Sequence, residues 1–148
     1  MSEAGSKSNL IKKLKPLDAL PIEHKFRVGI ADVECIGAWI ECKWMRSWPK
    51  NCDTSPVKFP HPLLKEQGIR ARNRWKAGGL HMVCVQVGRE WFFFSGLDIK
   101  DHFDKMTRPQ MREKAILYFD KGLDRDRLIG FILQTSQDML KDKFPEYL

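Results

Sequence analysis

The sequence predicts a mixed α/β domain, because strand-like and helix-like segments alternate along it. Runs of alternating or continuous apolar residues, which are typical of strands, occur at 25–34, 38–45, 80–87 and 91–95. Apolar residues at helical spacing occur at 8–15, 63–76, 107–120 and 125–143. The 148 residues contain no internal repeat, so we expect one domain over 1–148.

The first half of the chain predicts a helix followed by a hairpin. Residues 1–8 are small and polar and are expected to fray, and Ser8 or Asn9 would cap the helix over 8–15. Strands 25–34 and 38–45 are joined by Ile36-Gly37, a tight turn in which glycine can adopt a positive φ. The hairpin therefore brings these two strands side by side.

The second half predicts a long loop, a helix, two strands and two helices. Four prolines make 46–62 irregular, and Ala77-Gly78-Gly79 ends the helix over 63–76. The strand 80–87 is almost continuously apolar, which predicts a central position in the sheet. Pro109 lies in the first turn of the helix 107–120, and Asp124 would cap the helix 125–143.

Composition narrows the class of partner. The net charge of +7 and the pI of about 9.3 favour polyanions, with nucleic acid first and an anionic membrane second. No apolar run approaches the ~20 residues of a membrane span, and the N-terminus does not read as a signal peptide, so we expect a cytoplasmic protein. The four cysteines form no C-x-x-C pair. Their spacing matches no zinc pattern, which favours reduced thiols.

The hairpin carries the residues that point to chemistry. If Ile36-Gly37 form the turn, Cys35 pairs with Ala38 and Asp32 falls opposite Glu41. Lys43 lies two residues beyond Glu41 and therefore projects from the same face. Two carboxylates and one ammonium group are thus predicted to converge.

Two carboxylates at such a short distance repel each other, and a divalent cation would offset the repulsion. Mg²⁺ prefers one or two carboxylates and leaves room for phosphate oxygens, and the backbone carbonyl of Cys42 is a further candidate ligand. Lys43 would orient an attacking water or neutralise the developing oxyanion. The alternative is a cross-strand salt bridge on a solvated face. The apolar neighbours of the hairpin favour an interior site instead.

The residues Gly29-Ile30-Ala31-Asp32 followed by Trp39-Ile40-Glu41-Cys42-Lys43 resemble the motif of the PD-(D/E)xK nuclease superfamily, with Ala31 in place of the usual proline. Residues 61–88 resemble the helix and strand after the motif in small phage-type members. The resemblance implies a restriction-endonuclease-like fold, in which a mixed central sheet is flanked by helices. It also implies Mg²⁺ as cofactor, with Mn²⁺ as a substitute, and a role for Gln67 beside Asp32, Glu41 and Lys43.

The family often has a further glutamate on its first helix, and residues 8–15 offer none. Glu23 is the nearest candidate ligand for a metal. The small size fits a structure-selective enzyme of DNA recombination, similar to a Holliday junction resolvase, rather than a sequence-reading restriction enzyme. Such enzymes work as homodimers, and the faces of the two C-terminal helices could supply the interface. A phage-encoded member would act in the host cytoplasm.

Basic side chains supply a candidate DNA surface. They are Lys12, Lys13, Arg46, Lys65, Arg70, Arg74 and Lys76. Such contacts bind phosphates with little sequence preference. His61 and His81 are isolated histidines for which a structural role is predicted. Two alternatives stay open: a DNA-binding protein that keeps the fold without catalysis, and a nuclease that processes RNA.

Overall fold

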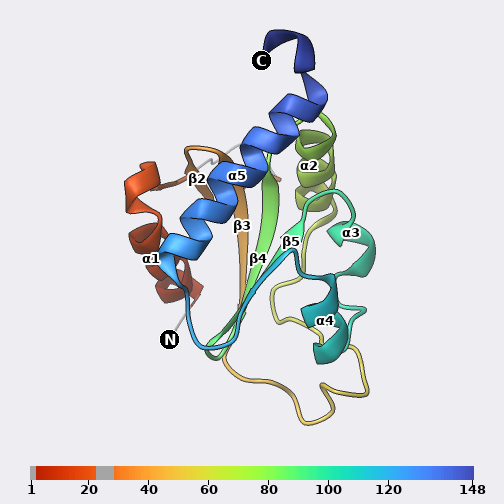
Figure 1. Cartoon of the computed structure of the whole chain (residues 1–148). Helices are drawn as coiled ribbons and strands as arrows, with labels where there is room; N and C mark the ends of the chain where they lie inside the picture. The colour runs from red at the N-terminus through yellow and green to blue at the C-terminus, as the bar shows by residue number, and fades with distance from the viewer. Residues whose placement is uncertain (1–2, 23–28) are drawn as a thin grey trace.

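The computed structural model describes residues 3–22 and 29–148, and its centre is a six-stranded sheet (Figure 1). The strands are β1 (Leu20–Pro21), β2 (Val33–Cys35), β3 (Ala38–Met45), β4 (His81–Val87), β5 (Glu90–Ser95) and β6 (Leu117–Phe119). They lie side by side in chain order, and only β3 and β4 are parallel neighbours. The predicted mixed α/β class is confirmed.

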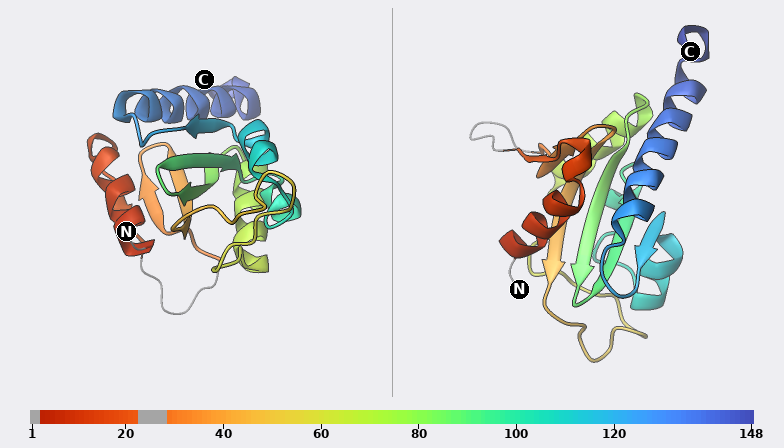
Figure 2. Two further views of the ribbon diagram at one scale, coloured as in Figure 1. Left: turned by 90° about the horizontal axis from the view of Figure 1, so that it is seen from below. Right: turned by 60° about the vertical axis from the view of Figure 1, so that its left-hand side comes forward.

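Helices cover both faces of this sheet. They are α1 (Glu3–Lys13), α2 (Lys65–Lys76), α3 (Ile99–His102), α4 (Arg108–Lys114) and α5 (Arg125–Lys143), with 3₁₀ turns at Lys15–Leu17 and Pro145–Tyr147. The two ends of the chain, α1 and α5, pack on one face, while α2 to α4 and the loop 46–64 lie on the other (Figure 2). The end of α5 projects beyond the sheet (Figure 1).

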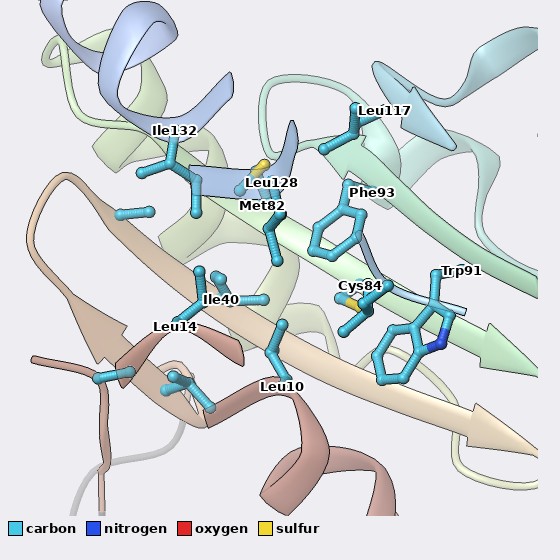
Figure 3. Close-up of a cluster of buried hydrophobic side chains, with 14 of the residues drawn as sticks. Leu10, Leu14, Ile40, Met82, Cys84, Trp91, Phe93, Leu117, Leu128 and Ile132 are labelled. Carbon is cyan, nitrogen blue, oxygen red and sulfur yellow. The ribbon is translucent and has the colours of Figure 1, made fainter. Parts of the chain in front are cut away.

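Alternation along the strands separates two apolar clusters. Leu10 and Leu14 of α1 meet Ile40 of β3 and Phe93 of β5 in the first cluster (Figure 3). The second cluster lies under α3, α4 and the loop. It includes Val85 and Phe92, which are fully buried, and Val57 and Phe59 of the loop. Since successive strand residues point to opposite faces, Glu41 and Lys43 belong to the face of the second cluster.

The hairpin has the predicted register. Cys35 pairs with Ala38 and Val33 with Ile40, so Ile36 and Gly37 are the two turn residues. Gly37 has a φ of 92°, which a side chain would disfavour. The pairing confirms the geometry from which the position of Asp32 was predicted.

A crossover joins the parallel strands β3 and β4. It consists of the loop 46–64 and α2, as a parallel pair requires. The predicted strands over 80–87 and 91–95 are confirmed as β4 and β5, and every residue of β4 is buried, in agreement with a central position. The predicted helices over 63–76 and 125–143 are confirmed too. Asp124 caps α5 by accepting from the Arg127 N–H at 3.1 Å.

Three predictions were wrong in part. Residues 3–8 are helical rather than frayed, because α1 begins at Glu3; residues 1–2 lie outside the described residues. Of the strand predicted over 25–34, only Val33 and Glu34 are strand residues in the described part, and 23–28 lie outside it. Gly29 has a φ of 93°, which interrupts the extended backbone before Asp32.

The helix predicted over 107–120 ends at Lys114. Ala115 is extended, with φ −60° and ψ 134°, and the chain continues into β6, which pairs with β5. Thr107 caps the shortened α4 by accepting from the Gln110 N–H at 3.3 Å. The apolar run after Ala115 therefore forms an edge strand, because β5 offers it a partner.

Candidate active site

The centre of β3 places an acidic and a basic side chain in the interior. Glu41 and Lys43 are only 2% and 6% exposed, and their facing atoms, Oε1 and Nζ, lie 3.5 Å apart. On β4 they face Val83 and Val85. A solvated salt bridge would not have this setting, and buried charges are costly unless they are paired or used. The interior position predicted for the pair is therefore observed.

Asp32 reaches the same site from the end of β2. Its Oδ2 accepts a hydrogen bond from the backbone N–H of Cys42 at 2.8 Å, and its carbonyl accepts from Ile22 N–H at 2.8 Å. The register of the hairpin, continued by one pair beyond Val33 and Ile40, sets Asp32 opposite Glu41. The two carboxylates are thus neighbours on one face.

Gln67 of α2 completes a quartet with Asp32, Glu41 and Lys43. Its Nε2 donates to Glu41 Oε1 at 2.7 Å, and its Oε1 accepts from Lys43 Nζ at 3.1 Å. The same Oε1 accepts from the backbone N–H of Leu64 at 2.9 Å, which fixes the amide at the start of α2. The predicted contribution of Gln67 to the site agrees with this position.

Two close approaches hold α2 against the site. A Cβ at Gly68 would lie 2.8 Å from the side chain of Lys100, so the glycine lets α2 pack tightly on α3. A Cβ at Gly29 would lie 2.7 Å from the carbonyl oxygen of Glu66, so a glycine is needed there as well. Gly68 directly follows Gln67 of the quartet, and Gly29 lies three residues before Asp32.

The electrostatics of the quartet are unbalanced. Burial and, to a smaller extent, the nearby charge of Asp32 together raise the pKa of the Glu41 carboxyl from 4.5 to about 9, against the opposing effect of Lys43. Glu41 Oε2 is buried and has no hydrogen-bond partner among the described residues. The side chains alone leave one carboxylate oxygen unsatisfied, and one carboxylate too many for one ammonium group.

This unsatisfied oxygen and the paired carboxylates fit a hard divalent cation. Mg²⁺ is commonly held by one or two carboxylates, with waters and phosphate oxygens as its remaining ligands. Asp32 and Glu41 are the side chains that would hold it. Within the described residues, no group of three or more His, Cys, Asp or Glu side chains is arranged to bind a metal. The predicted ligand Glu23 lies outside the described residues, and the Cys42 carbonyl stays a prediction.

The predicted DNA-binding residues are divided between the two faces. Lys65, Arg70, Arg74 and Lys76 lie on α2, above the sheet face that carries the quartet, and Arg46 follows the end of β3. Lys12 and Lys13 lie on α1, which packs against the opposite face. The structure therefore places four of the seven predicted residues on the helix that carries Gln67, and it leaves the two lysines of α1 on the opposite face.

The cysteines do not converge on one site. Cys42 belongs to the first apolar cluster and Cys52 to the second, on opposite faces of the sheet. Burial raises the pKa of the Cys35 thiol to about 11, and it raises the pKa values of Cys42 and Cys84 well above their ordinary value. Because zinc binds thiolates, this setting disfavours zinc ligation.

One residue of this face was assigned a structural role from the sequence. His81, the first residue of β4, is 2% exposed, and its Nδ1 has no hydrogen-bond partner among the described residues. Burial and, to a smaller extent, the charges of Arg70 and Arg74 together lower the pKa of the His81 imidazole to about 4. The only signal in the sequence was a histidine at the start of an apolar strand, which does not distinguish a site residue from a core residue.

No protein-family model and no curated protein matches this chain. In the part of the chain that the structure describes, none of the helices has both the length and the apolar character needed to cross a membrane.

Proposed function

We propose that the protein is a Mg²⁺-dependent endodeoxyribonuclease with a restriction-endonuclease-like fold. The observation that carries this proposal is the buried quartet, in which two carboxylates, a lysine and a glutamine from three segments meet on one sheet face. An interior arrangement of this kind is costly for folding alone. The resemblance of Asp32, Glu41 and Lys43 to the PD-(D/E)xK motif supports the same function.

The roles of the residues follow from their positions. Asp32 and Glu41 would hold the cation, which when bound would lower the pKa of a water and offset charge on the scissile phosphate. Lys43 can donate to the attacking water or to the phosphate oxygen that gains charge, since its ammonium group is tethered by Gln67 and Glu41. Gln67 keeps both of these side chains in place, so that little reorganisation is needed during the reaction.

DNA is the proposed substrate because the same side of the molecule is basic. The α2 residues Lys65, Arg70, Arg74 and Lys76 would contact phosphates around the quartet. A structure-selective enzyme that acts on branched DNA in the cytoplasm, as a homodimer, is the form we favour. Leu133 and Leu140 of α5, which are 44% and 43% exposed, offer an apolar strip for a second copy.

Cleavage assays on a panel of DNAs test the proposal. Linear duplex, single-stranded, flapped and four-way-junction DNA, with single-stranded RNA for comparison, would be incubated with Mg²⁺, with Mn²⁺ or with EDTA. We expect cleavage of at least one DNA with either metal and none with EDTA, and the preferred substrate would define the subtype. Binding without cleavage under every condition would instead support the non-catalytic DNA-binding protein, and cleavage of RNA alone would support the RNA-processing nuclease.

A further inference from the structure

A small cavity lies beside the quartet and plays no part in the proposed hydrolysis. Its volume is about 160 Å³, and it lies between α2, the segment before β2 and the first residues of β3 and β4. We refer to it as the arginine pocket. Its lining includes Ile30, Ala31, Trp39, Arg70, Arg74 and His81.

The arginine pocket adjoins the candidate active site directly. Ala31 precedes Asp32, and Trp39 lies two residues before Glu41 on β3, where alternate side chains share a face. Two residues of a strand span about 7 Å. A ligand in the pocket would therefore sit roughly one nucleotide away from a phosphate held at the quartet.

Two positive charges border the pocket. Arg70 and Arg74 lie one turn apart on α2, where like charges repel. In residues 3–22 and 29–148, neither guanidinium has an acidic partner within ion-pair distance. Glu34, a carboxylate in the pocket lining, is exposed and forms no ion pair with them. Burial and the charge of Arg70 lower the pKa of Arg74. An anion placed between the two arginines would relieve this repulsion.

The inner part of the pocket combines flat surfaces with an unsatisfied polar atom. The guanidinium of Arg74 lies 4.1 Å from the ring centroid of Trp39, so two planar groups are stacked at the pocket wall. The buried Nδ1 of His81 lacks a partner among the described residues, and such a group costs free energy until a ligand supplies a hydrogen bond. A site with planar walls and a hydrogen-bonding atom can bind a nucleobase, because the base stacks on the planar groups and its edge forms hydrogen bonds.

We propose that the arginine pocket receives one unpaired nucleotide of the DNA strand beside the bond that is cut. Its phosphate lies between Arg70 and Arg74, and its base enters the cavity next to Trp39 and His81. The cavity has the volume of roughly five water molecules, which admits one base and excludes a base pair. This inference rests on the proposed function for the identity of the polymer, and it adds a preference for DNA with an extruded or unpaired base.

Equilibrium binding in EDTA tests the pocket without cleavage. Three labelled DNAs would be compared by fluorescence anisotropy: a paired duplex, the same duplex with one extra unpaired nucleotide, and that duplex with the unpaired position made abasic. We expect the unpaired nucleotide to improve the Kd about tenfold over the paired duplex, which is within the usual range for one stacked base. The abasic position should lose this preference.

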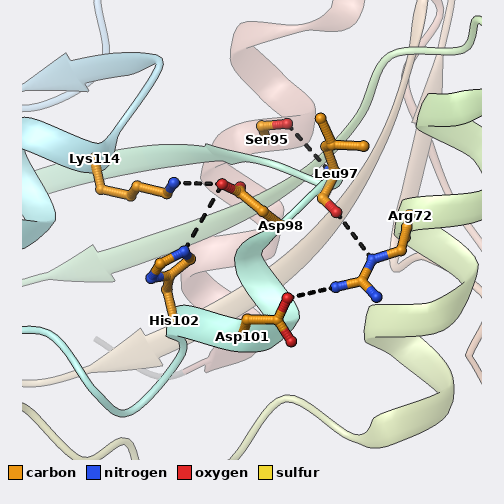
Figure 4. A network of polar contacts seen from close by, with 7 residues as sticks. All are labelled: Arg72, Ser95, Leu97, Asp98, Asp101, His102 and Lys114. Atoms are coloured by element: carbon orange, nitrogen blue, oxygen red, sulfur yellow. Dashed lines mark hydrogen bonds and ion pairs between the residues drawn. The ribbon is translucent and has the colours of Figure 1, made fainter.

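Variants of three arginines on α2 distinguish binding in the arginine pocket from general electrostatic attraction to DNA. Arg70→Gln and Arg74→Gln should bring the preference down to about onefold. Arg72→Gln is the matched control, because Arg72 carries the same charge on α2 but is turned toward α3, where it donates to Leu97 O at 3.0 Å and to Asp101 at 2.7 Å (Figure 4). It should weaken binding to all three DNAs equally and keep their ratio.

The outcomes distinguish the two proposals. Equal binding of the three DNAs by the wild type, a preference that survives in both pocket variants, or no DNA binding at all would overturn the inference. If the preference depends on Arg70 and Arg74 but the protein cuts no DNA with Mg²⁺, the nucleotide-binding role of the pocket is supported and the nuclease function is contradicted. If the protein cuts DNA with Mg²⁺ but shows no preference for the unpaired nucleotide, the nuclease function is supported and the role of the pocket is contradicted.

Discussion

The side-chain amide of Gln67 donates to Glu41 Oε1 at 2.7 Å, and this bond joins α2 to the buried carboxyl group of β3. The carbonyl of the same amide accepts from Lys43, so one neutral side chain sets the position of both charged ones. Such neighbours of a catalytic group affect the rate although they undergo no chemistry.

Gln67→Ala should lower the single-turnover rate of DNA cleavage about 10–100-fold, the usual effect of losing a residue that orients catalytic groups. Gln110→Ala is a matched control, because Gln110 accepts from Thr107 N–H at 2.9 Å at the corresponding position of α4, away from the quartet. Both variants lose a bond at a helix start, yet only Gln67→Ala should slow cleavage. Equal rates for the two variants would show that the contact with Glu41 has no catalytic role.

The pH dependence of stability should report on Glu41. Its folded pKa of about 9 lies above the ordinary value of 4.5, so the folded state binds the proton more tightly than the unfolded state. The stability from this group is full below pH 4.5 and is lost as the pH rises to about 9. Denaturant titrations without metal should show this loss in the wild type but not in Glu41→Gln. Since the metal binds the ionised carboxylates, Mg²⁺ should stabilise the wild type more as the pH rises.

His81 should stay neutral in mildly acidic solution. Its pKa of about 4 lies below the ordinary 6.5, so the unfolded state takes up the proton first, and stability is lost as the pH falls from 6.5 to about 4. An NMR titration of the imidazole should give a midpoint near 4. A midpoint near 6.5 would mean that the ring is not enclosed as the structure shows.

A second buried carboxylate, Glu90, should be important for folding rather than for cleavage. It accepts from Trp48 Nε1 and Tyr118 OH, and it pairs with Arg108 at 2.8 Å. Glu90→Ala would leave these donors without their acceptor, which should lower the free energy of unfolding by about 2–4 kcal/mol, with allowance for the partial exposure of Arg108. The exposed Glu113→Ala should change it by less than about 0.5 kcal/mol, and urea unfolding compares the two.

Alanine substitutions at two glycines of similar conformation distinguish the cost of backbone strain from the cost of steric crowding. Gly122 has a φ of 97°, and among the described residues no atom beyond its chain neighbours lies within 4 Å of the position that a methyl group would occupy, so Gly122→Ala should cost about 1–2 kcal/mol. Gly29 has a φ of 93°, but a methyl group there would meet the Glu66 carbonyl at 2.7 Å. Gly29→Ala should therefore cost about 1–3 kcal/mol more than Gly122→Ala and also slow cleavage, because Asp32 follows closely. Equal costs, measured by urea unfolding, would contradict the close approach of this segment to α2.

Local rules were sufficient for the hairpin. The two-residue turn at Ile36-Gly37 fixes the register of β2 and β3, and strand alternation then sets Glu41 and Lys43 on one face. The spacing of apolar residues also identified α2, and with it the position of Gln67 close to the start of that helix. The convergence of Asp32, Glu41 and Lys43 could therefore be predicted from the residues alone, whereas the contribution of Gln67 was predicted only from the motif resemblance.

Long-range pairing was not visible in the sequence. The apolar run Leu117–Phe119 is compatible with a buried helix or with a strand. It forms the strand β6 because it pairs with β5, and this pairing cannot be read from the local sequence. Lys12 and Lys13 were assigned to the DNA surface from charge, but the packing of α1 on the first apolar cluster directs them to the other side of the sheet. The arginine pocket requires α2, β3 and β4 together, so no local pattern could show it.

Single-turnover cleavage by wild type and Lys43→Ala tests the central claim most directly. Both would be measured with saturating Mg²⁺ on the preferred DNA, after their Kd values for that DNA are shown to agree. The exposed Lys141→Ala serves as the charge-matched control. The proposed role of Lys43 predicts a rate about 10²–10³-fold lower in Lys43→Ala and an unchanged rate in Lys141→Ala. Cleavage by Lys43→Ala at the wild-type rate would show that the buried quartet is not the catalytic centre.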